Sequence, residues 1–140
     1  MSIDAFSHLA WLPVIVGAVL YYIVGAIWYS PPLLLNQWRR AVGLPMTSER
    51  PGPKEFVVPA ITSIVMSIAI GALAAATGTT TLSAGIILGL TVGVGFALMM
   101  TLLDSYLGAP KPQPMNAFLI IGAYHVIGLT IVGAVIGVWR

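Results

Sequence analysis

Leu82–Leu103, with the sequence LSAGIILGLTVGVGFALMMTLL, carries no charged side chain and decides the fold class. A helix needs roughly 20 predominantly apolar residues to span the hydrocarbon core of a bilayer. Three further apolar runs fill most of the chain, at Leu9–Tyr29, Val57–Ala76 and Ala117–Trp139. Because no water pairs backbone groups inside a bilayer, such runs are forced into helices. We expect residues 1–140 to form one all-α domain that crosses the membrane four times.

The composition agrees with a membrane protein. The chain is 59% apolar and 7% charged, with a mean hydropathy of +0.99, whereas a soluble domain has roughly 25% charged residues. The basic residues do not form a clustered face, so nucleic acid is not an expected partner. Cysteine is absent, which excludes disulfides and thiolate chemistry. The first run has Asp4 and no basic residue ahead of it, so we read it as a retained helix and not as a cleaved signal peptide.

The basic residues also predict an orientation. Lys and Arg favour the cytoplasmic side of short loops. The loops after the first and third runs share one side of the membrane. The opposite side has one basic residue, Arg140 at the far end of the chain. The two loops carry five: Arg39, Arg40, Arg50, Lys54 and Lys111. We therefore expect these two loops to face the cytoplasm and both termini to lie outside.

A short amphipathic helix is predicted over residues 31–42. Ser30 suits an N-cap, Pro31 the first helical position and Gly43 the residue after the last turn. One side of this helix is apolar and the other polar, which indicates a helix in the membrane interface. A lipid-headgroup or regulatory site around Arg39 and Arg40 is the alternative. The expected interfacial anchors are Trp28, Tyr29, Trp38, Arg39, Arg40 and Trp139.

Small residues recur at four-residue spacing in three of the runs, and such rows let helix backbones approach closely. The rows are Gly85, Gly89, Gly93 and Ala97 in the third run, Ser63, Ser67, Gly71 and Ala75 in the second, and Gly133 and Gly137 in the fourth. They mark helix interfaces, either within one chain or between copies. Thr91–Gly95 resembles a potassium-channel filter, but it lies in the middle of its run and Gly93 belongs to the glycine row. We therefore assign it to the helix.

Ionisable groups inside membrane segments are functional candidates. His125 lies inside the fourth run beside Tyr124, and Asp104 closes the third run at its cytoplasmic end. His125 is either a hydrogen-bonded residue between helices or a proton relay. No carboxylate occurs within the spans, which disfavours a proton-coupled exporter. No catalytic motif or metal-ligand spacing is present, so we expect no enzyme activity, cofactor or metal.

Segments of the first and last apolar runs resemble a known family. Gly25–Pro31 (GAIWYSP), Gly122–His125 (GAYH) and Gly133–Arg140 (GAVIGVWR) are similar to the opening and closing motifs of the bacterial domain of unknown function family 1761. The resemblance covers the full length. It implies a small four-helix membrane protein of unassigned activity, and it supplies no catalytic residues.

Two functions remain open at this point. The first is a non-enzymatic structural or accessory subunit, or a homo-oligomer, that acts through glycine-rich helix packing within the lipid bilayer and in a larger membrane complex. The second is a small oligomeric transporter or channel with a pathway lined by Tyr21, Tyr22, Tyr124 and His125. A cavity beside Tyr124 and His125 would favour transport, whereas tight contact with neighbouring helices would favour the structural role.

Overall fold

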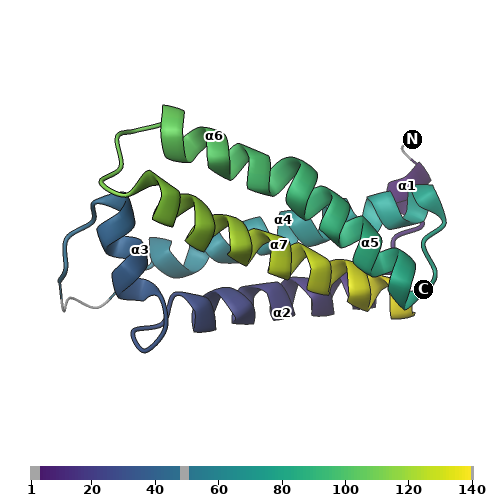
Figure 1. Ribbon diagram of the computed structural model, residues 1–140. Helices are drawn as coiled ribbons and strands as arrows, with labels where there is room; N and C mark the ends of the chain where they lie inside the picture. Colours follow the sequence, from purple (N-terminus) through teal and green to yellow (C-terminus); the bar gives the residue numbers. More distant parts are fainter. Residues whose placement is uncertain (1–3, 48–50, 140) are drawn as a thin grey trace.

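The computed structural model describes residues 4–47 and 51–139, and all regular structure within them is helical (Figure 1). The elements are α1 Asp4–Ser7, α2 Trp11–Trp28, α3 Leu35–Val42, α4 Lys54–Thr77, α5 Leu82–Val92, a π-helical segment Gly93–Leu98, α6 Met99–Leu107 and α7 Pro114–Trp139. The segments α5, Gly93–Leu98 and α6 follow one another without a break.

Four helices of the described chain are long and apolar enough to cross a membrane: α2, α4, the combined helix Leu82–Leu107, and α7. The predicted all-α fold with four membrane helices is therefore confirmed. The helices depart slightly from the apolar runs. For example, α4 begins at Lys54 and the third helix continues to Leu107, because polar residues can extend a helix beyond the hydrocarbon layer.

The fourth helix is the centre of the bundle. α2, α4 and α5 all pack against α7, and Figure 1 shows α7 running through the middle of the molecule. The N-terminal helix α1 and the end of α7 lie at one end, together with the hairpin between α4 and α5. In this hairpin Gly78 adopts a left-handed conformation with φ 67°, and the Thr81 side chain accepts a hydrogen bond from the Ala84 N–H.

The short helix α3 differs from the sequence prediction. It begins at Leu35 instead of Pro31, and the Ser30 hydroxyl donates to the Ile27 carbonyl instead of capping α3. Pro31 and Pro32 lie instead in a turn, in which the Leu33 N–H donates to the Ser30 carbonyl at 3.1 Å and the Leu34 N–H donates to the Trp28 carbonyl at 3.2 Å. Gly43 ends α3 with φ 80°, as predicted.

The apolar side of α3 packs on the bundle. Ala41 is fully buried, α3 contacts α7, and the Trp38 ring lies 5.3 Å from the Tyr29 ring at 66°. The backbone N–H of Gln113, just before α7, also donates to the Ala41 carbonyl at 3.2 Å. This face of α3 therefore covers the end of the bundle, and its exposed polar side contains Asn36, Gln37 and Arg40.

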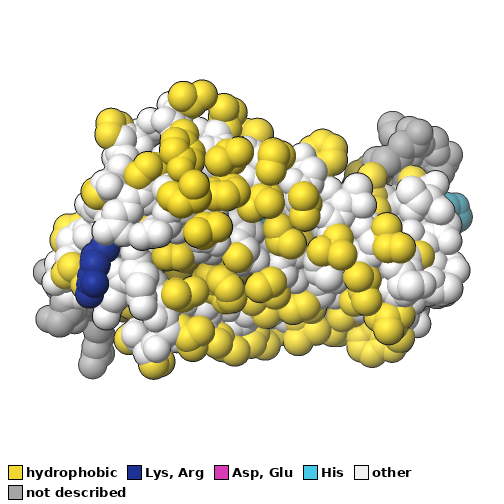
Figure 2. Space-filling view, in the orientation of Figure 1, with side chains coloured by type: hydrophobic (Ala, Val, Ile, Leu, Met, Phe, Trp, Pro, Cys, Tyr) yellow, Lys and Arg dark blue, Asp and Glu magenta, His cyan; other side chains and the backbone are white. Residues whose placement is uncertain are grey.

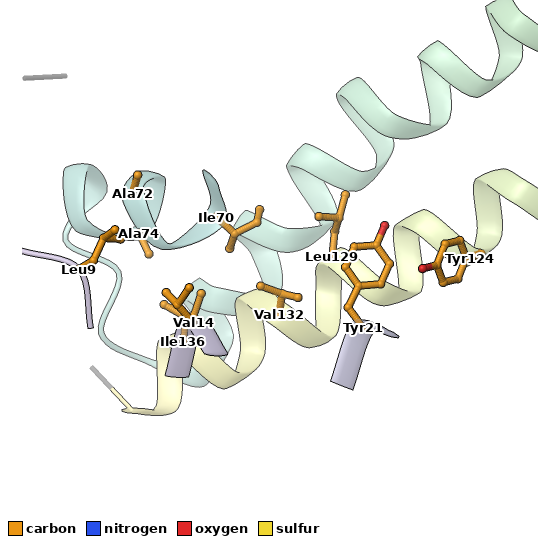
Figure 3. Packing of buried hydrophobic residues seen from close by; sticks show 10 residues of the cluster. All are labelled: Leu9, Val14, Tyr21, Ile70, Ala72, Ala74, Tyr124, Leu129, Val132 and Ile136. Carbon is orange, nitrogen blue, oxygen red and sulfur yellow. The ribbon is translucent and has the colours of Figure 1, made fainter. Parts of the chain in front are cut away.

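The buried core is small and lies along α7. Figure 3 shows its members, which are Leu9, Val14, Tyr21, Ile70, Ala72, Ala74, Tyr124, Leu129, Val132 and Ile136. Large apolar side chains elsewhere point outward, and Figure 2 shows them over the whole visible face of the bundle. An outward-facing apolar surface of this extent suits contact with lipid.

Candidate functional site

Five glycines form a close contact between α5 and α7, which we call the glycine seam: Gly85, Gly89, Gly93, Gly133 and Gly137. A Cβ added at Gly85 would lie 3.1 Å from the Gly137 Cα and would overlap the Gly133 carbonyl. A Cβ added at Gly89 would lie 2.7 Å from the Thr130 Cα, and one at Gly93 would lie 3.0 Å from the Val126 Cα. The two backbones are therefore in direct contact, and these glycine rows meet within one chain.

The small residues of α4 lie against α2. The fully buried Ser67 donates its hydroxyl to the Val14 carbonyl at 2.7 Å, and a Cβ at Gly71 would lie 2.6 Å from Val14 Cγ2. Ser63 is also buried, but its hydroxyl donates to Pro59 within α4. Ser67 and Gly71 thus pack α4 against α2, whereas the Ser63 hydroxyl forms its hydrogen bond within α4.

Aromatic side chains and one histidine meet between α2 and α7, in a group that extends from the middle of α2 to its end and that we call the tyrosine cluster: Tyr21, Tyr29, Tyr124 and His125. The Tyr124 ring centroid lies 5.2 Å from that of Tyr21 and 5.4 Å from that of Tyr29. Figure 3 shows the Tyr21 and Tyr124 rings facing one another from α2 and α7. Tyr21 is 1% exposed and Tyr124 is 7% exposed, so both rings are packed between helices.

His125 joins this cluster through a hydrogen bond. The Tyr21 hydroxyl lies 2.5 Å from His125 Nδ1 and also 3.3 Å from the Met66 sulfur. His125 itself is only half-buried. The Nδ1 side of the His125 ring therefore lies in the packed cluster, and the rest of the ring borders a more open region.

That region is a groove of about 540 Å³, which we call the His125 groove. Its walls come from α4, from the helix Val92–Asp104 and from α7, and its members are Met66, Ala69, Ile70, Val92, Phe96, Ala97, Met100, Thr101, Asp104, Ile121, His125 and Leu129. Figure 1 shows α6 diverging from α7 beyond the point where α5 crosses it. The groove lies in this diverging half.

A second groove of about 380 Å³ lies between α2 and α4 and contains Tyr22, which gives it the name Tyr22 groove. Its wall also includes Ala18, Ala60 and Ser63. Tyr22 is therefore separated from the other three side chains of the predicted pathway, which meet in the tyrosine cluster. Tyr21 and Tyr124 are buried, His125 lies on one groove and Tyr22 on the other.

Asp104 lies at the end of the His125 groove and is paired with a loop lysine. Its carboxylate is 3.0 Å from the Lys111 Nζ, which also donates to the Asp104 carbonyl at 2.9 Å. The Asp104 side chain is 63% exposed and that of Lys111 is 10% exposed. This pair holds the loop against the end of α6, and it does not include His125.

The predicted interfacial anchors fall into two groups. Trp28 donates its indole N–H to the Ile120 carbonyl at 3.0 Å, and the Arg39 guanidinium donates to the Thr47 carbonyl at 2.8 Å. Trp28, Tyr29 and Trp38 thus connect elements of the bundle, whereas Arg39 binds the segment that follows α3. Arg40 and Trp139 are exposed instead. In the part of the chain that the structure describes, no three His, Asp or Glu side chains gather in a way that would hold a metal ion.

Two parts of this site were not predicted from the sequence. One is the π-helical segment Gly93–Leu98, which separates the close half of the third helix from the diverging half. The pair Gly93 and Gly95 was the available indication, because neighbouring glycines loosen a helix. The other is the Tyr21–His125 hydrogen bond, since nothing in two separate apolar runs shows which of their faces meet.

Comparisons with known proteins give one match. The family described as "Protein of unknown function (DUF1761)" matches residues 12–137. No curated protein and no solved structure matches the chain. The matched region runs from the first membrane helix to the last, and it includes the glycine seam, the tyrosine cluster, the His125 groove and the Tyr22 groove except Trp11. The chain therefore belongs to the DUF1761 family of proteins of unknown function.

Proposed function

We propose that this is a non-enzymatic membrane protein that acts as a small structural or accessory subunit in a bacterial cytoplasmic membrane. One observation carries this proposal: the polar side chains that are buried between the spans, Tyr21, Tyr124 and Ser67, pack helices against one another. Tyr21 and Tyr124 are buried against each other, and the Tyr21 hydroxyl lies 2.5 Å from His125 Nδ1. A catalytic centre needs a nucleophile or an acid–base pair held toward a substrate space.

The glycine seam bears on how such a subunit associates. Gly85 and Gly89 already contact Gly133 within the chain, so these surfaces are not available to another copy. A homo-oligomer or a larger complex would use the outer faces of the bundle. The face that includes Gly95 is one such surface, because a Cβ added there meets nothing within 4 Å.

Native purification tests the subunit role. The protein is extracted in a mild detergent, and its mass is measured with that of anything that co-migrates. We expect either a defined homo-oligomer or a complex with a second membrane protein. A monodisperse monomer under every extraction condition would contradict the proposal.

The proposed orientation places both termini outside and α3 on the cytoplasmic side. It is supported by the five-to-one distribution of basic residues. Introduced cysteines test it in intact cells with a membrane-impermeant maleimide. Thr80→Cys in the α4–α5 hairpin should react, and Thr47→Cys after α3 should be protected until the membrane is opened. Both side chains are exposed, so the reverse pattern would overturn the orientation.

A transport role is the second candidate, and the position of His125 on a groove favours it. Histidine is the side chain that most readily changes charge near neutral pH. In reconstituted vesicles, a pH-dependent flux that disappears in His125→Gln would favour transport over the structural role. Under the structural role, we expect no flux and an intact complex, with a stability loss of about 1 kcal/mol because glutamine retains a hydrogen-bonding group.

A further inference from the structure

The His125 groove has the dimensions of a ligand site. Its volume of about 540 Å³ lies within the range of roughly 300–1,000 Å³ that is typical of small-molecule sites. Along the third helix it runs from Val92 to Asp104, which is about 18 Å at 1.5 Å per residue. Phe96 and Met100 on its wall are 68% and 65% exposed, so the groove opens toward lipid. This shape suits a long apolar molecule that enters from the bilayer.

The π-helical segment contributes directly to this shape. Phe96 and Ala97 belong to both the segment and the groove wall. A π turn adds a residue to the helical turn and redirects the helix after it, and such turns occur frequently at functional sites. Here it lies where the close contact of α5 with α7 gives way to the diverging α6.

The hydrogen bonding of His125 determines whether its free ring nitrogen is a donor or an acceptor toward the groove. Tyr21 has a single hydroxyl proton, and a thioether sulfur is a weak acceptor. Since Nδ1 is at 2.5 Å and the Met66 sulfur at 3.3 Å, the Tyr21 proton is best assigned to the bond with Nδ1. A neutral imidazole that accepts at Nδ1 carries its own proton at Nε2. Charging the ring at this depth would be costly, so His125 offers the groove an N–H donor.

That donor needs a partner. Among the described residues, no hydrogen-bond acceptor contacts His125 Nε2. A polar group without a partner in hydrocarbon costs free energy. His125 lies at the middle of α7, where a phospholipid supplies only acyl chains, because its headgroup stays at the membrane surface. An acyl chain would fill the groove and leave the N–H unpaired.

We propose that the His125 groove binds a neutral, lipid-soluble molecule that has a carbonyl-bearing ring and an apolar tail, of the alkyl- or isoprenyl-quinone class. The carbonyl oxygen accepts the hydrogen bond from His125 Nε2, and the tail lies along the apolar wall between α4 and α6. Such a molecule brings an uncharged acceptor to the depth of His125, which phospholipids do not. This inference does not depend on the subunit role proposed above.

Binding is measured with decyl-benzoquinone as the probe and with the full chain in lipid nanodiscs, after partition into empty nanodiscs has been subtracted. We expect saturable binding with one site per chain. Decyl-benzene, which has the same tail without carbonyl groups, should compete poorly. Absence of saturable binding, or equal competition by decyl-benzene, would overturn the proposal.

One groove variant and one matched control locate the site. Ala97→Phe fills the His125 groove and should abolish binding, whereas Ala60→Phe fills the Tyr22 groove and should leave it unchanged. Thermal unfolding of each variant shows whether it is folded. If Ala97→Phe binds as the unchanged protein does, the site lies elsewhere and the proposal fails.

Substitutions of His125 test the hydrogen bond and remain informative if Ala97→Phe does not fold. His125→Leu should weaken decyl-benzoquinone binding about tenfold, which corresponds to the loss of one hydrogen bond. His125→Gln retains a side-chain N–H and should restore much of the affinity. If both variants bind normally, or if a co-purified protein occupies the groove and excludes the probe, the proposal is wrong.

Discussion

The two halves of the third membrane helix meet α7 in different ways. In the first half, Gly85 and Gly89 bring the backbones into direct contact. In the second half, the helix diverges and the His125 groove opens. Apolar side chains gain little free energy when they move from lipid to a helix interface, so close packing is a main source of helix association in a membrane. The first half therefore holds the bundle together, and the second half leaves the groove in which we propose that a ligand binds.

The largest expected effect comes from a bulky side chain in the glycine seam, which would force α5 away from α7. Gly89→Leu should destabilise the protein by about 3 kcal/mol or more, because its Cβ alone would lie 2.7 Å from the Thr130 Cα. Thermal unfolding and size-exclusion chromatography in detergent measure the loss. Ala26→Leu, at an exposed position of α2, is the control and should be mild. Unchanged stability and oligomeric state in Gly89→Leu would mean that the row does not face α7.

An intermediate effect is expected at the tyrosine cluster. Tyr21→Phe removes the partner of His125 Nδ1 at 2.5 Å, and a polar group left unpaired in the interior costs about 2 kcal/mol. Reversible unfolding in mixed detergent with increasing dodecyl sulfate measures this difference. Tyr22→Phe is the matched control on the Tyr22 groove and should cost less than about 0.5 kcal/mol. Equal losses in the two variants would argue against the Tyr21–His125 bond.

The smallest of these effects is at the α2–α4 contact. Ser67→Ala removes the 2.7 Å hydrogen bond to the Val14 carbonyl and should cost about 1 kcal/mol, since single hydrogen bonds between membrane helices contribute modestly. Thr62→Ala serves for comparison, because the Thr62 hydroxyl bonds only to Val58 and Pro59 of its own helix. A greater loss in Thr62→Ala than in Ser67→Ala would contradict the assigned contact.

The apolar runs predicted the helices, because length and hydropathy alone decide what can cross a bilayer. The predicted start of α3 was wrong, because Ser30 donates back to Ile27 and the chain forms a turn over Pro31 and Pro32 before α3 begins at Leu35. Four-residue spacing identified Gly85 and Gly89 as interface residues but not their partners. Pairing between helices depends on three-dimensional packing, which a single sequence does not contain. For the same reason, the contact between Tyr21 and His125 could not be predicted from the sequence.

A parallel measurement of Gly89→Ala and Gly95→Ala tests the central claim most directly, because each adds a single methyl group to the same membrane helix. Alanine is a better helix former than glycine by about 1 kcal/mol. At Gly95, where an added Cβ meets nothing within 4 Å, the substitution should therefore leave the free energy of unfolding unchanged or raise it. At Gly89 the methyl group meets the backbone of α7, so the free energy of unfolding should fall. Equal changes at the two positions, or a loss at Gly95 alone, would contradict a closed contact with α7 at Gly89 and an outward-facing position at Gly95 of the same helix.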